Sequence, residues 1–169
     1  MAFVVNVIAS NSNVGKTTLI VGLVKELKSR GYRIATIKHD AHDFEIDQEG
    51  KDTWKHRQAG ADTGLISSKS KIALIKSIET EAALEQLVDM VKDDVDFVII
   101  EGYKGSSFPK IEVYREGVSE RRLDIDDTFI AVATDSPDAI DDVVVVLDIN
   151  NYKEIADFLI NYFKRGAKC

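Results

Sequence analysis

Apolar residues follow two spacings along the chain: short continuous runs, and recurrence every three or four positions. A run from Phe3 to Ala9 predicts a buried strand, and helical spacing after it predicts a helix over about 16–30. Gly31 is placed to end that helix, and residues 32–37 predict a second strand, which completes a βαβ unit with parallel strands. A continuous apolar run at 97–100 predicts a strand buried on both faces, and further strands are predicted at 110–115, 129–134 and 143–147.

The middle of the chain is more polar and predicts smaller elements. The segment from Lys38 to Lys51 is long for a connection inside a compact domain, which favours a functional loop. A short helix is predicted at 52–60, with Asp52 or Thr53 near its N-cap, and a hairpin at 63–67 with 71–78. A further helix is predicted at 80–92, capped by Thr80. A closing helix is predicted from about 151 onward, starting near Asn151 with Glu154 in a capping-box arrangement. Strands that alternate with helices predict an α/β fold with a mostly parallel sheet and helices on both faces.

Composition narrows the classes of protein to consider. The 169 residues are 44% hydrophobic and 30% charged, as in a globular protein, and predict a single domain, 1–169. A net charge of −7, with no long run of lysine or arginine, argues against nucleic acid as a partner. No apolar stretch has the length of a membrane span, and the one cysteine, Cys169, permits no intrachain disulfide, so we expect a cytoplasmic protein without a membrane partner.

The segment between the first strand and the first helix carries the clearest chemistry. Its residues are typical of a P-loop, in which backbone N–H groups surround an anionic phosphate: Ser12, Asn13, Val14, Gly15, Lys16, Thr17 and Thr18. We expect Lys16 to reach the β- and γ-phosphates of a nucleoside triphosphate and the Thr17 hydroxyl to bind Mg²⁺. Ser10 stands where the pattern asks for glycine, a tolerable change because serine is small and accepts turns. The expected fold is therefore of the P-loop NTPase type.

An acidic residue ends the buried strand at 97–100. Glu101 there has the form of a Walker B carboxylate, and at the carboxyl edge of a parallel sheet it would face the P-loop and hold Mg²⁺. The alternative to a metal-binding role is that Glu101 only marks the end of the strand, beside a turn. Lys104 follows the same turn and is a further candidate for contact with phosphate.

The polar loop at 38–51 carries several candidate groups. Lys38 and His39 are able to donate to anionic oxygens, while Asp40 or Asp47 is able to position Mg²⁺ or an attacking water, so Asp40 and Asp47 join Lys16 as candidate catalytic residues. Two alternatives remain open: a divalent-metal site built on the two histidines of the loop, the second being His42, and a merely solvated acidic segment. Lys51, at the start of the short helix, makes a second anion site or a plain helix cap.

Several segments, in order, resemble the molybdopterin-guanine dinucleotide biosynthesis protein B (MobB) family. Besides the P-loop they are 37–47 (Ile-Lys-His-Asp-Ala-His-Asp-Phe-Glu-Ile-Asp), 50–53 (Gly-Lys-Asp-Thr), 58–61 (Gln-Ala-Gly-Ala), 101–104 (Glu-Gly-Tyr-Lys), 109–112 (Pro-Lys-Ile-Glu) and 147–150 (Leu-Asp-Ile-Asn). The resemblance implies a homodimeric GTP-binding protein with weak GTPase activity. It also implies that the protein assists the attachment of GMP to molybdopterin, chemistry that belongs to a partner nucleotidyltransferase of the MobA type.

The base that the protein binds is less clear from the residues. Asp135 ends a late strand, where a carboxylate is able to accept hydrogen bonds from guanine, but the usual Asn-Lys-x-Asp signature is absent and 135–138 is also a good turn sequence. One alternative function is a P-loop kinase or a phosphate-activating ligase that acts on a small metabolite; another is a metal-delivery protein that uses His39 and His42. A kinase usually supplies several arginines from a lid, and the one cluster here, Arg115 with 121–122, lies among acidic residues. Because no glutamine or arginine near the motifs is clearly placed to complete a GTPase site, we expect slow turnover.

Overall fold

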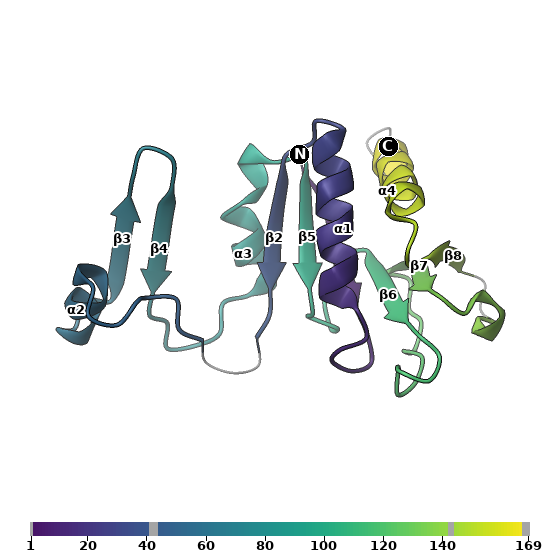
Figure 1. Ribbon diagram of the computed structural model, residues 1–169, viewed down its shortest axis with the longest axis horizontal. Helices are drawn as coiled ribbons and strands as arrows, with labels where there is room; N and C mark the ends of the chain where they lie inside the picture. The colour runs from purple at the N-terminus through teal and green to yellow at the C-terminus, as the bar shows by residue number, and fades with distance from the viewer. Residues whose placement is uncertain (1, 41–43, 142–143, 167–169) are drawn as a thin grey trace. The chain divides into compact units, whose positions relative to one another are not determined.

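The chain divides into two compact units, drawn in Figure 1. Residues 1–39 and 84–169 form the first, here called the sheet unit, and residues 40–83 form the second, here called the hairpin unit. This computed structural model describes residues 2–40, 44–141 and 144–166. The prediction that the whole chain is one nucleotide-binding domain stays a prediction.

The sheet unit is built on a parallel six-stranded sheet. Its strands are β1 (Phe3–Ile8), β2 (Ile34–Lys38), β5 (Phe97–Glu101), β6 (Lys110–Tyr114), β7 (Phe129–Thr134) and β8 (Val145–Asp148), in the spatial order β2-β5-β1-β6-β7-β8. Every neighbouring pair runs parallel, which confirms the predicted sheet. All six carboxyl ends therefore lie at one edge of the sheet, where parallel α/β folds bind ligands.

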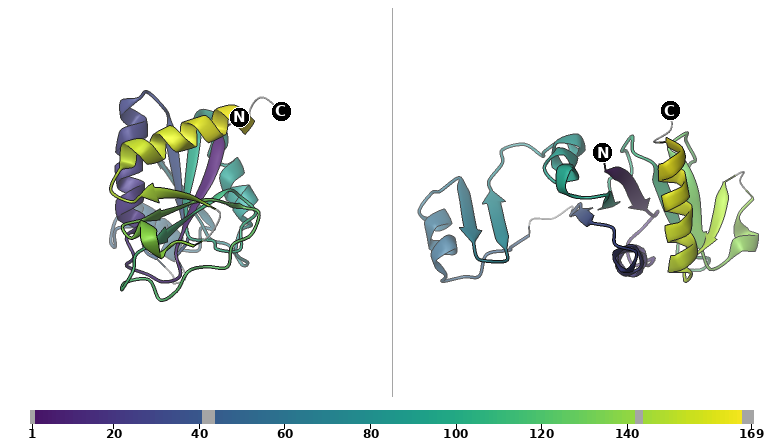
Figure 2. Two further views of the ribbon diagram at one scale, coloured as in Figure 1. Left: turned by 90° about the vertical axis from the view of Figure 1, so that its right-hand side faces the viewer. Right: turned by 90° about the horizontal axis from the view of Figure 1, so that it is seen from above.

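Helices cover both faces of this sheet, as Figure 2 shows in its left view. Helices α1 (Lys16–Ser29) and α4 (Tyr152–Gly166) pack on one face in a single apolar core, while α3 (Leu84–Asp89) packs on the other face against Val98 and Ile100. The α1–α4 contact is close because α1 carries Gly22 there: a Cβ on Gly22 would lie 2.6 Å from ring atoms of Tyr152. The α/β fold with helices on both faces is confirmed.

The helix predicted from a Thr80 cap is wrong in its bounds. Helix α3 begins at Leu84 and ends at Asp89, and a separate 3-10 turn covers Lys92–Asp94. Since Leu84 and Val88 are the buried residues of α3, the packing that supports a helix extends over little more than this one segment. Another 3-10 turn, Pro137–Ala139, follows β7.

Two other helix starts were also predicted. For the closing helix the prediction is confirmed, because the Asn151 side chain accepts a hydrogen bond from the N–H of Glu154 at 3.2 Å and α4 begins at Tyr152. For the short helix it is wrong by one residue. There the N-cap position is Lys51, which makes no side-chain cap, and Asp52 lies in the first turn, where its charge favours the helix dipole. The last strand begins at Val145, and residues 142–143 lie outside the described part.

The hairpin unit contains α2 (Asp52–Gln58) and the antiparallel pair β3 (Thr63–Ser67) and β4 (Ile72–Lys76), which confirms the predicted hairpin. Leu65 lies opposite Leu74, and Ser67 lies opposite Ile72, so these residues share one face. Helix α2 contacts β3, and a Cβ on Gly64, which lies on the other face, would be 3.9 Å from the Arg57 side chain. No apolar residue among those described between 40 and 83 is buried.

Candidate nucleotide-binding site

The P-loop joins β1 to α1 at the carboxyl edge of the sheet. Two of its residues have left-handed backbone conformations, Asn13 with φ 62° and Gly15 with φ 112°. Asparagine and glycine are the residues that adopt this region most readily, and alternation of left- and right-handed residues turns successive N–H groups toward one point. The local sequence therefore folds into a concave cradle for an anion, at the start of a helix.

Two ammonium groups lie on this cradle. Lys16 Nζ donates to the Asn11 carbonyl at 3.0 Å, and Lys104 Nζ donates to the Ser10 carbonyl at 2.6 Å. Burial lowers the pKa of Lys16 below its usual range; Glu101 opposes this shift and Lys104 adds to it. Two cations held against loop carbonyls are able to exchange those contacts for the stronger ones that phosphate oxygens offer.

Thr17 and Glu101 meet beside the cradle. Thr17 Oγ1 donates to Glu101 Oε1 at 2.8 Å, although the two residues come from the start of α1 and the end of β5. A threonine hydroxyl and a carboxylate are the oxygen ligands that Mg²⁺ takes together with waters and phosphate oxygens, so this pair fits Mg²⁺. The sheet thus brings the two candidate metal ligands together.

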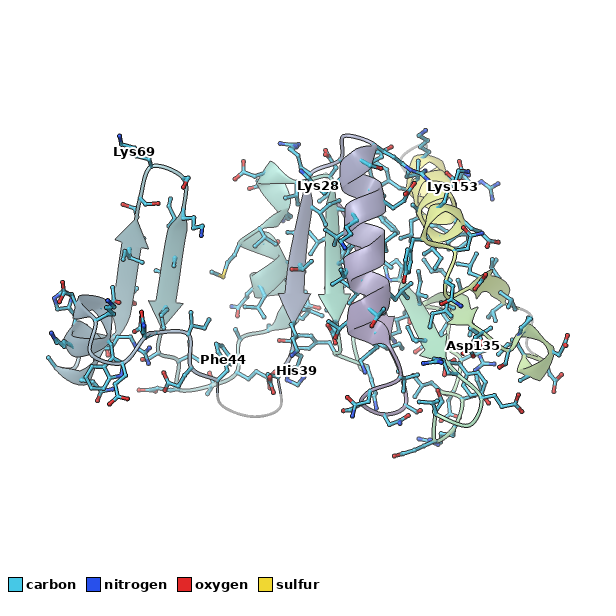
Figure 3. The ribbon with its side chains drawn as sticks, in the orientation of Figure 1. Lys28, His39, Phe44, Lys69, Asp135 and Lys153 are labelled. Carbon is cyan, nitrogen blue, oxygen red and sulfur yellow. The ribbon has the colours of Figure 1, made fainter. Side chains whose placement is uncertain are left out.

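Lys38 and His39 adjoin this pair. Lys38 ends β2 in register with Glu101 on β5, and the N–H of His39 donates to the Glu101 carbonyl at 3.0 Å. The His39 ring packs against the Tyr103 ring with 4.5 Å between ring centroids and a tilt of 38° between the ring planes. Gly102 allows the approach, because it has φ 98° and a Cβ there would lie 3.2 Å from the His39 Cβ. His39 lies below the ends of these strands in Figure 3.

The other candidates in the polar loop belong to the hairpin unit. Asp47 pairs with Arg57 at 2.9 Å with its side chain only 7% exposed, which ties the start of this unit to α2. Lys51 is exposed at the N-cap of α2, and Asp40 is also exposed. His42 lies outside the described residues, and within them no group of three or more His, Cys, Asp or Glu side chains is arranged to hold a metal. The roles predicted for Asp40, Asp47 and Lys51 stay predictions.

Asp135 is engaged with an arginine that sequence reasoning did not assign to the site. Asp135 Oδ2 accepts a hydrogen bond from Arg115 Nε at 2.8 Å, and this contact lowers the pKa of Asp135. Arg115 directly follows β6 and Asp135 directly follows β7, so the parallel pairing of these strands places the two residues together. The signal in the sequence was the position of Arg115, one residue beyond a buried strand at the carboxyl edge.

A small cavity of about 130 Å³ lies beside Arg115. It is lined by the P-loop and the first turn of α1, by Arg115, and by the turn that leads from β8 into α4: Val14, Gly15, Thr18, Leu19, Arg115, Ile149, Asn150 and Tyr152.

Asn11 links the P-loop to the segment after β6. Its side-chain amide donates to the Val118 carbonyl at 3.1 Å and accepts from the N–H of Glu120 at 3.1 Å. The segment that carries Arg115 is therefore fastened to the phosphate cradle by a side chain of the cradle itself.

Comparison with known proteins finds relatives along most of the chain. The family model of molybdopterin guanine dinucleotide synthesis protein B (MobB) matches residues 4–135. The chain is 35% identical over 156 residues to the molybdopterin-guanine dinucleotide biosynthesis adapter protein of Haemophilus influenzae, with 92% of this chain and 86% of the relative covered. The adapter protein of the same name from Escherichia coli is 37% identical over 162 residues, covering 93% and 91%. A crystal structure of molybdopterin-guanine biosynthesis protein B matches the fold with a TM-score of 0.73 at 25% identity, covering 96% of this chain and 99% of that one.

Among the helices of the described residues, none has the length and apolar composition of a membrane span.

Proposed function

Because the chain belongs to the MobB family, we propose that it is an adapter in the synthesis of molybdopterin guanine dinucleotide that binds GTP and Mg²⁺. The relatives are named as adapters in this synthesis, and the P-loop supplies what an adapter needs in order to hold a nucleotide. The observation that carries the proposal is the 2.8 Å hydrogen bond between Thr17 and Glu101, which joins a P-loop hydroxyl to a carboxylate on the adjacent strand. We place the protein in the cytoplasm.

Each residue of the cradle has a distinct part in this proposal. The N–H groups around Gly15 surround the β-phosphate, and Lys16 and Lys104 leave the loop carbonyls to bind phosphate oxygens. Thr17 and Glu101 hold Mg²⁺, which neutralises charge on the β- and γ-phosphates. Hydrolysis is slow in this proposal. A fast GTPase also needs a residue that orients water and a cation that stabilises the transition state, and no glutamine or arginine near the motifs is clearly placed for these parts.

The partners in this proposal are molybdopterin and a nucleotidyltransferase of the MobA type. Molybdopterin carries a phosphate, so it needs an anion site other than the P-loop. Lys51, at the start of α2, is the cationic group proposed for that second anion. Lys38 and His39, at the end of β2, are proposed to donate to anionic oxygens of the nucleotide or the pterin. The adapter would hold the nucleotide, and the transferase would make the new bond.

The hairpin unit is proposed as the site of homodimer formation. On one face of the β3–β4 pair, Leu65, Ile72 and Leu74 are 62%, 74% and 47% exposed. An isolated two-stranded hairpin is marginally stable in water. If two copies pack these faces together about a two-fold axis, the three side chains of each copy are buried against the other.

A reconstituted transfer reaction tests the proposed function. Purified MobA-type transferase, molybdopterin, GTP and Mg²⁺ would be mixed with the wild-type protein or with Lys16→Ala, and the guanine dinucleotide product measured by chromatography. We expect the wild-type protein to raise the yield and Lys16→Ala to raise it far less. A matched control is Lys28→Ala, which removes an exposed lysine from the far end of α1. If wild type and Lys16→Ala stimulate the reaction equally, the nucleotide-binding role is wrong.

A further inference from the structure

Two features on opposite sides of the start of α1 fix the direction in which a nucleotide would lie. Thr17 and Glu101 meet on the side of β5 and β2, whereas the 130 Å³ cavity at Thr18 opens toward Arg115 and the β8–α4 turn. Figure 3 shows this separation, with His39 and Asp135 on either side of α1. Since Mg²⁺ binds the β- and γ-phosphates, the terminal phosphate belongs to the first side and the nucleoside to the second. This step rests on the proposed binding of GTP.

Arg115 is fixed at the cavity by its backbone and by its side chain. Its carbonyl accepts hydrogen bonds from the N–H groups of Val118 and Ser119, at 3.1 and 2.8 Å, and its own N–H donates to Ser119 Oγ at 2.9 Å. Its Nε donates to Asp135 at 2.8 Å. The two terminal nitrogens make no hydrogen bond with any residue that the structure describes, so their parallel N–H groups are available to a ligand.

The hydrogen-bonding groups on the edge of a purine base decide which base the two terminal nitrogens of Arg115 recognise. Guanine presents two neighbouring acceptors, O6 and N7, which match the paired donors of a guanidinium, whereas adenine presents N7 beside an amino group that is itself a donor. We propose that Arg115 is the residue that selects guanine, by donating from its two terminal nitrogens to O6 and N7 of a base held in this cavity.

The remaining walls of the cavity suit a flat heterocycle. Ile149 and Tyr152 supply apolar surface, and Ile149 Cδ1 lies 3.9 Å from the position that a Cβ on Gly15 would take. Asn150 lines the same cavity and is exposed, so its amide is placed to bond the ring edge. Asp135 then acts as a positioning residue, because its carboxylate holds the guanidinium in one orientation.

Four nucleotides and four proteins test this assignment. Calorimetry with Mg²⁺ would give the affinities of GTP, ITP, XTP and ATP for wild type, Arg115→Gln, Asp135→Asn and Arg121→Gln. Arg121 is the matched control, since it is an exposed arginine of the same segment with no assigned contact in the described residues. Inorganic tripolyphosphate serves as a ligand that engages the P-loop without a base.

The expected results follow from the atoms that each base presents. ITP keeps O6 and N7 and lacks the 2-amino group, so it should bind wild type nearly as well as GTP. Arg115→Gln should lose about 5- to 100-fold in GTP affinity, the range set by one bidentate base contact, with ATP and tripolyphosphate affinities unchanged. Arg121→Gln should behave as wild type, and Asp135→Asn should weaken GTP and ITP together.

Three outcomes would overturn the assignment while leaving the proposed function in place. In the first, Arg115→Gln still prefers GTP over ATP. In the second, Arg115→Gln loses as much affinity for tripolyphosphate as it loses for GTP. In the third, the wild type does not bind ITP while Asp135→Asn gains affinity for XTP. The third pattern would mean that Asp135 contacts N1 and the 2-amino group directly. Failure of the wild type to bind any of the nucleotides would overturn the proposed function, and the assignment with it.

Discussion

Two leucines show how differently the two units of this chain are built. Leu23, on α1 in the sheet unit, is 0% exposed, whereas Leu65, on β3 in the hairpin unit, is 62% exposed. The sheet unit buries apolar side chains on both faces of its sheet, but no described apolar residue of the hairpin unit is buried. The hairpin unit is held by its ladder and by contacts such as the Asp47–Arg57 ion pair.

The difference assigns separate tasks to the two units. Full burial of a leucine contributes about 1.5–3 kcal/mol to the free energy of folding, so the sheet unit has within itself the means to hold its carboxyl edge rigid. Catalytic and binding groups need this rigidity, and the P-loop, Glu101 and Arg115 all lie at that edge. Apolar side chains left uncovered on a hairpin instead indicate a surface that a partner covers.

The largest expected effect comes from removing the buried leucine. Leu23→Ala should lower the free energy of unfolding by about 2–5 kcal/mol, because it leaves a cavity between α1 and the sheet. The matched change Leu65→Ala, studied at protein concentrations low enough for a monomer, should shift it by no more than about 0.5 kcal/mol. Urea unfolding followed by circular dichroism measures both, and equal losses would remove the distinction between the units.

The next effect concerns assembly. Leu65→Asp places a charge on the apolar face of the hairpin and should raise the dissociation constant of the proposed homodimer at least tenfold, measured by analytical ultracentrifugation. Lys69→Asp is the control: it changes the charge by two units, twice as much, at the exposed tip between β3 and β4, labelled in Figure 3, and should leave the dimer intact. A wild type that stays monomeric at every concentration would end the proposal of a homodimer through this face.

A smaller effect tests the close approach of two helices inside the sheet unit. Gly22→Ala gains about 1 kcal/mol of helix propensity but drives a methyl group into the Tyr152 ring, at a cost of about 1–3 kcal/mol, so the variant should be less stable than wild type. In a Tyr152→Ala background the clash is gone and the same change should stabilise the protein. The reversal of sign between the two backgrounds, seen in thermal or urea unfolding, is the decisive readout.

The smallest expected effect is on the pH dependence of binding. Burial holds the pKa of Lys16 below its usual range, and bound phosphates raise it again by favouring the charged ammonium. GTP affinity should therefore fall as the pH rises from the lowered pKa of the free protein toward the higher pKa of the complex. Lys16→Arg, whose guanidinium stays charged, should show little of this fall as the pH approaches the usual lysine pKa of about 10.4. Identical profiles for the two proteins would mean that Lys16 does not titrate in the site.

Local patterns were enough to predict most of the sheet unit. Strand β5 is a continuous apolar run up to Glu101, because this central strand is buried on both faces, and the P-loop is a contiguous motif whose backbone conformation its own residues favour. The approach of Thr17 to Glu101 also followed, since a parallel sheet gathers its carboxyl ends at one edge.

Contacts between distant segments were harder to predict. The Arg115–Asp135 ion pair depends on the register of β6 and β7, which no local pattern gives, so Asp135 was considered without its partner. The bounds of α3 depend on which residues reach the sheet, and the pairing of Asp47 with Arg57 depends on the fold of the hairpin unit, so Asp47 too was considered without its partner. In each case a tertiary contact decided what a single residue type could not.

Calorimetric titration of Mg²⁺ and GTP into wild type and Lys16→Ala tests the central claim most directly, namely that the carboxyl edge of the sheet unit is a GTP site. We expect one nucleotide per chain for wild type and a loss of at least tenfold in affinity for Lys16→Ala, since a charge-assisted contact is worth about 1.5–3 kcal/mol. Binding that is unchanged in Lys16→Ala, or that is absent from a folded wild type, would contradict the claim.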